Sequence, residues 1–139
     1  MRRVHLAWGI LALAAFAASG QVMLRHSPPM HLLSNDVRLM YRSRHIYLLG
    51  SGIANVLIGL YLVPFRAYWR RNLQFVGSLL LLAAPVLLGM AFVAETGHGL
   101  DRTWRSGTGL KMMLGGTILH FVAAFGQDSA AREDSADRV

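Results

Sequence analysis

An uncharged run of twenty residues, 46–65, constrains the fold of this chain most strongly. A helix of twenty residues spans about 30 Å, the thickness of the hydrocarbon core of a bilayer. Within and just before this run, His45, Gly52, Asn55 and Gly59 recur on one helical face. Small and amide-bearing side chains inside a bilayer favour contacts with other helices. The run is therefore predicted to be the central helix of a membrane bundle.

Three more apolar segments have membrane length, at residues 4–24, 73–94 and 107–126. Together with 46–65 they predict an all-α fold, a transmembrane four-helix bundle over residues 1–126. The acidic, Ser- and Ala-rich segment 127–139 is expected to be a disordered polar tail. Residues 1–20 also fit a cleaved signal peptide, and this alternative stays open. The chain has no cysteine, which excludes disulfides and thiolate metal sites.

Prolines and capping residues predict several helix boundaries. Side chains suited to helix capping precede Asp36, so the second helix is expected to begin near that residue. Pro64 is expected to close it, with residues 66–71 forming a tight basic turn. Pro85 is predicted to kink the third helix and to free the carbonyl of Leu81, because proline has no N–H group.

The basic residues indicate a membrane protein rather than a nucleic-acid-binding one. Thirteen arginines and one lysine give a net charge of +7, and they gather at the ends of apolar runs, where they meet lipid headgroups. Four spans put both termini on one side of the membrane. Basic residues are equally numerous on the two sides, so the arginine pair before the first span and the basic 66–71 segment decide the orientation. We expect a multi-pass membrane protein with cytoplasmic termini.

Two sets of residues are candidates for a packed polar core. Gly52, Asn55 and Gly59 form the face of the second span, and Gly116 and His120 form a face of the fourth span that is expected to pack on the second. His120 is expected to hydrogen-bond between helices, to Asn55 or a backbone carbonyl, with a ligand or proton-relay role as the alternative. Asn55 could instead contact a substrate or quinone.

Imidazole and thioether side chains gather at the predicted outer ends of the spans, and this ligand set suits copper. The candidate metal or haem ligands are His26, Met30, His31, His45 and His98. Their spacing matches no fixed motif. A b-type haem would need two histidines at equal depth, which His45 and His98 could supply. His5 and His120 are expected to pair poorly as haem ligands unless a helix tilts, because His120 lies deeper in its helix.

The middle half of the chain contains several short segments of note, residues 41–49 (YRSRHIYLL), Asn55, 59–61 (GLY), 77–78 (GS) and 84–88 (APVLL). Together they resemble small bacterial inner-membrane proteins of unassigned function, without pointing to a named family. The resemblance implies a location in the bacterial inner membrane. It implies no catalytic residue.

The chain contains no known catalytic motif. In addition, no carboxylate lies in the middle of a predicted span, and this absence argues against proton-coupled transport. The predicted function is that of a non-enzymatic accessory component of a membrane assembly, without a cofactor. Its expected partners are the lipid bilayer and other membrane proteins, and not nucleic acid. The alternative is a haem- or copper-binding protein for redox chemistry or metal handling.

Overall fold

The computed structural model describes residues 1–97 and 103–125, and these residues form helices and connections without any strand. The four α-helices are α1 (Arg2–Leu24), α2 (Asn35–Tyr61), α3 (Tyr68–Glu95) and α4 (Trp104–Ala124). A short 3-10 helix, η1 (Met30–Leu32), lies between α1 and α2. The prediction of an all-α fold with four helices is confirmed.

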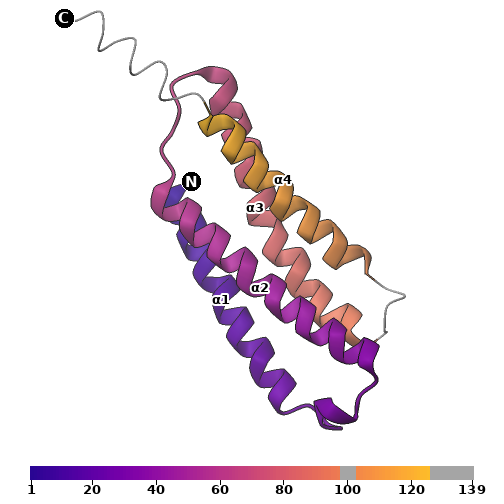
Figure 1. Cartoon of the computed structure of the whole chain (residues 1–139). Helices are drawn as coiled ribbons and strands as arrows, with labels where there is room; N and C mark the ends of the chain where they lie inside the picture. The colour runs from indigo at the N-terminus through magenta and orange to yellow at the C-terminus, as the bar shows by residue number, and fades with distance from the viewer. Residues whose placement is uncertain (98–102, 126–139) are drawn as a thin grey trace, which may run out of the picture.

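The helices form two antiparallel hairpins, α1 with α2 and α3 with α4, and α2 joins the hairpins by packing on α3 (Figure 1). The helix α1 begins and the helix α4 ends at the same end of this bundle, which we call the N-terminal end. The opposite end carries η1 and is called the η1 end. At the N-terminal end, the guanidinium of Arg2 donates to the last helical carbonyls of α2, those of Gly59 (3.3 Å) and Leu60 (2.9 Å).

Two boundaries of the second and third helices differ from the prediction. The helix α2 begins at Asn35, close to the expected start, but it ends at Tyr61, before Pro64. Proline disfavours helical geometry in the preceding residue, and the backbone of Leu62 is already extended. The expected basic turn at 66–71 is wrong in part, because α3 begins at Tyr68 and includes Arg70 and Arg71. These residues are good helix formers that no glycine or proline interrupts, so the helix extends outward.

Close approach between helices occurs at glycines. A Cβ atom added to Gly9 of α1 would lie 2.7 Å from the backbone nitrogen of Val56 in α2. On the facing side, a Cβ atom on Gly59 would lie 2.8 Å from the backbone nitrogen of Leu6, and one on Gly52 would meet Leu13. These backbones touch because no side chain separates them, as is common between helices in membranes.

The face of α4 that carries Gly116 packs on α3 rather than on α2, which corrects the prediction. A Cβ atom on Gly116 would lie 2.8 Å from the carbonyl oxygen of Gly77, so two small residues face each other here. A short connection makes antiparallel neighbours of consecutive helices, and this gives α3 precedence over α2 as the partner.

Polar side chains fill much of the interior, while large apolar ones face outward. Asn55 and Glu95 are 0% exposed, whereas Ile10 is 61% and Val93 83% exposed. A protein that folds in water buries large apolar groups first, whereas here some, such as Leu81 and Leu88, are buried but many more are exposed. By length and composition, α1 and α3 are the two helices of the described residues that could cross a membrane.

Candidate functional site

Asn55 is the centre of a buried polar cluster where α1, α2 and α3 meet. Its amide nitrogen donates to the carbonyl oxygens of Ser51 (3.0 Å) and Leu81 (2.8 Å). These two acceptors fix the orientation of the amide, so its oxygen faces Nδ1 of His5 at 2.8 Å. An amide oxygen can only accept, and Nδ1 of His5 must therefore carry the proton.

The carbonyl of Leu81 is available to Asn55 because of Pro85. Proline has no N–H group, and the helical bond from residue 85 to the carbonyl of Leu81 cannot form. The amide of Asn55 occupies that carbonyl from α2, and the indole of Trp8 donates from α1 to the neighbouring carbonyl of Leu82 at 2.7 Å. Side chains from both helices of the other hairpin thus donate to two adjacent carbonyls of α3, one turn before Pro85.

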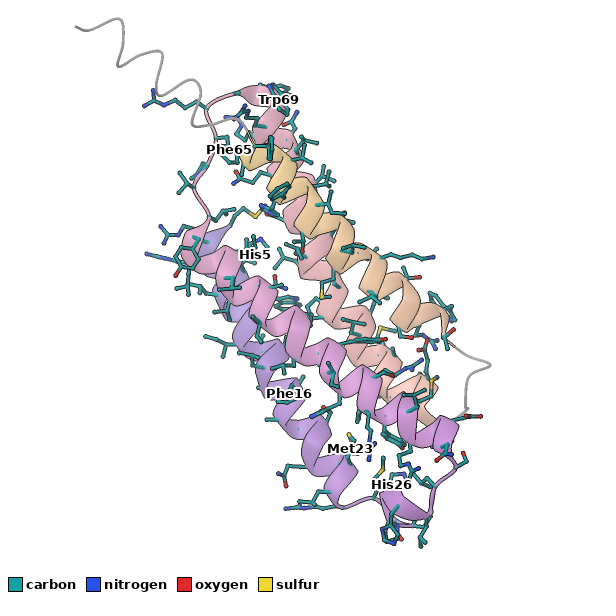
Figure 2. The ribbon with its side chains drawn as sticks, in the orientation of Figure 1. His5, Phe16, Met23, His26, Phe65 and Trp69 are labelled. Atoms are coloured by element: carbon teal, nitrogen blue, oxygen red, sulfur yellow. The ribbon has the colours of Figure 1, made fainter. Side chains whose placement is uncertain are left out.

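His5 and His120 approach each other at the N-terminal end, contrary to the expectation that they pair poorly. Their ring centroids are 6.4 Å apart and the rings are nearly perpendicular. His5 lies in the first turn of α1 and His120 near the end of α4, so the antiparallel arrangement puts them at equal depth. Figure 2 shows His5 between the two hairpins.

The remaining ring nitrogens of this histidine pair have different surroundings. Nε2 of His120 lies 3.2 Å from the hydroxyl of Ser78 in α3, and not beside Asn55 as one expectation had it. Nε2 of His5 is buried and has no hydrogen-bond partner. Since Nδ1 of His5 holds the proton, this buried atom carries a lone pair that no donor meets.

A second buried cluster joins α2, α3 and α4 near the η1 end. The guanidinium of Arg44 donates to a carboxylate oxygen of Glu95 (3.1 Å) and to the hydroxyl of Ser106 (3.0 Å). The other carboxylate oxygen accepts the backbone N–H of Arg105 at 2.7 Å, at the start of α4. The carboxylate therefore neutralises a buried cation and also caps a helix whose first N–H groups lack partners.

The sequence analysis did not identify this ion pair. A signal for it exists, because Arg44 precedes the second predicted span and Glu95 follows the third, which places both at the same end of antiparallel helices. Opposite charges at one depth of adjacent spans are candidates for a buried pair.

A cavity of about 590 Å³ lies at the η1 end, between the last turns of α1, the connection that contains η1, and α2. Four of the predicted metal or haem ligands line it, namely His26, Met30, His31 and His45. Met23 of α1 also contributes to the wall, and Figure 2 shows Met23 and His26 at this end of the bundle. The fifth predicted ligand, His98, lies outside the described residues.

Hydrogen bonds fix the tautomers of two histidines in this cavity. The hydroxyl of Ser19 donates to the carbonyl of Phe16, so it accepts from Nδ1 of His45 at 2.8 Å. Nδ1 of His26 lies 2.8 Å from the carbonyl oxygen of Pro28, which can only accept. Both rings therefore carry the proton on Nδ1 and a lone pair on Nε2.

Within residues 1–97 and 103–125, no group of three or more His, Asp or Glu side chains is placed to hold a metal ion. A zinc site built from such ligands is not preformed there. Comparison with known proteins adds no identification: no family model matches the chain, and neither a curated protein nor a solved structure matches it. The roles of these side chains follow from their geometry alone.

Proposed function

We propose that this chain is a multi-pass protein of the bacterial inner membrane, in which all four helices cross the bilayer. The observation that carries the proposal is the combination of fully buried polar side chains with extensive exposed apolar surface. Fully buried Asn55 and Glu95 lie inside, and apolar side chains such as Ile10, Leu57 and Ile118 are exposed on three different helices. In water, full exposure of such a side chain forfeits about 1.5–3 kcal/mol, and these three are about half exposed. In lipid it costs nothing, and the buried polar groups hold the helices together.

The lower hydrophobicity of α2 and α4 is also compatible with crossing a bilayer. The charged residues of α2 lie in its first turns, and the uncharged part, 46–61, is about 24 Å long. The apolar segment 62–65 continues it toward the N-terminal end. In α4, Lys111 is exposed and long enough to reach the headgroups. A short span is tolerated by local thinning of the bilayer at modest cost.

The use made of the buried polar groups supports a non-enzymatic, accessory role in a membrane assembly. The amide of Asn55 forms hydrogen bonds to three residues, and both of its N–H groups are used. The carboxylate of Glu95 is engaged by Arg44 and by the backbone of α4. Groups held in this way stabilise the arrangement of helices instead of meeting a substrate. The exposed apolar surface would contact lipid and other membrane proteins.

The distribution of arginines supports cytoplasmic termini. Arg2, Arg3, Arg66, Arg70 and Arg71 lie at the N-terminal end of the bundle, where α1 begins and α2 leads into α3. A dense basic cluster at short connections favours the cytoplasmic side.

Membrane extraction and labelling of single cysteines test this proposal. The chain has no cysteine, so each introduced thiol is read without background. We expect the protein to remain in the membrane pellet after alkaline carbonate extraction. In intact spheroplasts, a membrane-impermeant maleimide should label Ser34→Cys, in the connection between α1 and α2, and should label Ala67→Cys, between α2 and α3, only after lysis.

The two cysteine positions serve as matched controls for each other. Release of the protein by carbonate would contradict membrane integration. Labelling of both thiols in intact spheroplasts would contradict the claim that α2 crosses the membrane. Labelling of Ala67→Cys alone would show that the orientation is opposite to the proposed one.

A further inference from the structure

We propose that the cavity at the η1 end is a binding site for a soft monovalent metal ion, Cu(I), held by thioethers of Met23 and Met30 and by Nε2 of His26 and His45. The four side chains come from α1, from the connection that follows it and from α2, and all of them line one cavity. The proposal does not depend on how many helices cross the membrane.

The state of the two imidazoles is the first argument. A metal-binding histidine commonly donates its other ring N–H to a fixed acceptor, which sets the tautomer and the direction of the ring. Nδ1–H of His45 donates to the hydroxyl of Ser19, and Nδ1–H of His26 donates to the carbonyl of Pro28. The lone pair on Nε2 of His26 accepts from the hydroxyl of Tyr41 at 3.1 Å. A metal ion at Nε2 of His26 must displace this hydroxyl, so the ring of Tyr41, which packs edge-on against His26 and Phe92, has to move.

Gly20 of α1, which has no side chain, leaves space beside the ring of His45. A Cβ atom added to Gly20 of α1 would lie 3.2 Å from Cε1 and 3.8 Å from Nε2 of His45. Gly20 and His45 both line the cavity, so the edge of the ring that carries the lone pair is next to the cavity wall where α1 offers no side chain. Nδ1, bonded to the other side of Cε1, is the nitrogen that Ser19 holds.

The composition of the wall selects the kind of metal. The residues that line the cavity include no carboxylate, but they include Arg38 and Arg42. Methionine and neutral histidine bring no negative charge, so a bound ion keeps its full charge beside these guanidinium groups. A monovalent ion is therefore preferred to a divalent one. Thioether sulfur is a soft ligand and favours Cu(I) over Zn²⁺.

The same geometry disfavours an anion as the ligand. Two arginines in the wall would attract phosphate or a carboxylate, but an anion also needs N–H donors from the residues around it. Nε2 of His45 carries a lone pair beside the cavity wall, and this lone pair would repel an anionic oxygen. The guanidinium of Arg38 already donates to the side chain of Asn35.

Competition for Cu(I) tests the site in the full chain, purified in detergent without oxygen. We expect one Cu(I) per chain to be retained against a chromophoric Cu(I) chelator. The double variant Met23→Leu/Met30→Leu should weaken retention by more than about tenfold, since it removes both sulfur ligands with little change of volume. Met90→Leu, in an exposed position on α3, is the matched control and should bind as the wild type does.

X-ray absorption at the copper edge of the wild-type protein supplies a readout that needs no variant. We expect both sulfur and nitrogen neighbours around the metal. The proposal is overturned if the chain retains no Cu(I), if the double variant binds as tightly as the wild type, or if the spectrum shows no sulfur neighbour. Tighter binding of Zn²⁺ than of Cu(I) would overturn it as well.

Discussion

The hydrogen bond from Asn55 to the carbonyl of Leu81 exists because Pro85 leaves that carbonyl without its helical partner. If this reasoning is correct, the loss of unfolding free energy on replacing Asn55 must depend on the residue at position 85. In Pro85→Ala, the new N–H group can bond to the carbonyl of Leu81 within α3. Replacement of Asn55 by leucine should then lower the free energy of unfolding less than it does when position 85 is proline.

The magnitude follows from the two interhelical bonds of Asn55, to His5 and to Leu81. Bonds of this kind between membrane helices contribute on average about 0.6 kcal/mol and at most about 1.7 kcal/mol each. Asn55→Leu should therefore lower the free energy of unfolding by about 1–3 kcal/mol. The share that belongs to Leu81, about 0.6–1.7 kcal/mol, should vanish when position 85 is alanine.

A double-mutant cycle measures this dependence. The wild type, the two single variants and the Asn55→Leu/Pro85→Ala variant are unfolded in mixed micelles by increasing amounts of sodium dodecyl sulfate, and helicity is followed by circular dichroism. Asn72→Leu is the matched control, because Asn72 is exposed on α3. It should change the free energy of unfolding by less than about 0.5 kcal/mol.

The coupling energy decides the outcome. If Asn55→Leu costs the same beside proline and beside alanine, to within about 0.3 kcal/mol, then Pro85 does not create the acceptor for Asn55. The account of this cluster would then be wrong.

Three further results are expected. In the same unfolding assay, Gly9→Ala should destabilise the bundle, because its Cβ would lie 2.7 Å from the backbone of α2. Gly50→Ala, with open space around it, should be neutral or stabilising by up to about 1 kcal/mol. Glu95→Gln should lower the free energy of unfolding by about 3–5 kcal/mol, because it leaves the guanidinium of Arg44 buried without its counter-ion. A smaller decrease of this free energy in Arg44→Met/Glu95→Gln would identify the unpaired charge as the cause. Ser19→Ala should weaken Cu(I) retention about 10–100-fold by releasing the ring that it orients, and unchanged retention would argue against that orienting role.

Features that depend on the local chain could be predicted from the sequence. The four helices follow from the length of the apolar runs, and the end of α1 and the start of α2 follow from the break between them. The free carbonyl of Leu81 follows from covalent structure alone, since Pro85 cannot donate to it. The crossing of the membrane by all four helices remains a prediction.

Features that depend on how helices rotate and pair could not be predicted in the same way. Gly116 marks a contact face of α4, but a pattern of small residues does not say which neighbour it will meet, and the neighbour is α3. The approach of His5 to His120 requires the register between the first and last helices, which no local pattern contains. The cavity that unites His26 with His45 likewise depends on how the connection through η1 folds back.

The central claim, that the exposed apolar side chains of α2 and α4 face lipid, can be tested most directly by spin labels in bilayers. Leu57→Cys on α2 and Ile118→Cys on α4 are labelled singly, with Ser34→Cys as the water-exposed reference. We expect oxygen, which dissolves in lipid, to relax the labels at positions 57 and 118 far more than a water-soluble nickel chelate does, and the reverse at position 34. If the nickel chelate reaches positions 57 and 118 as readily as position 34, these helices lie in water and the account is contradicted.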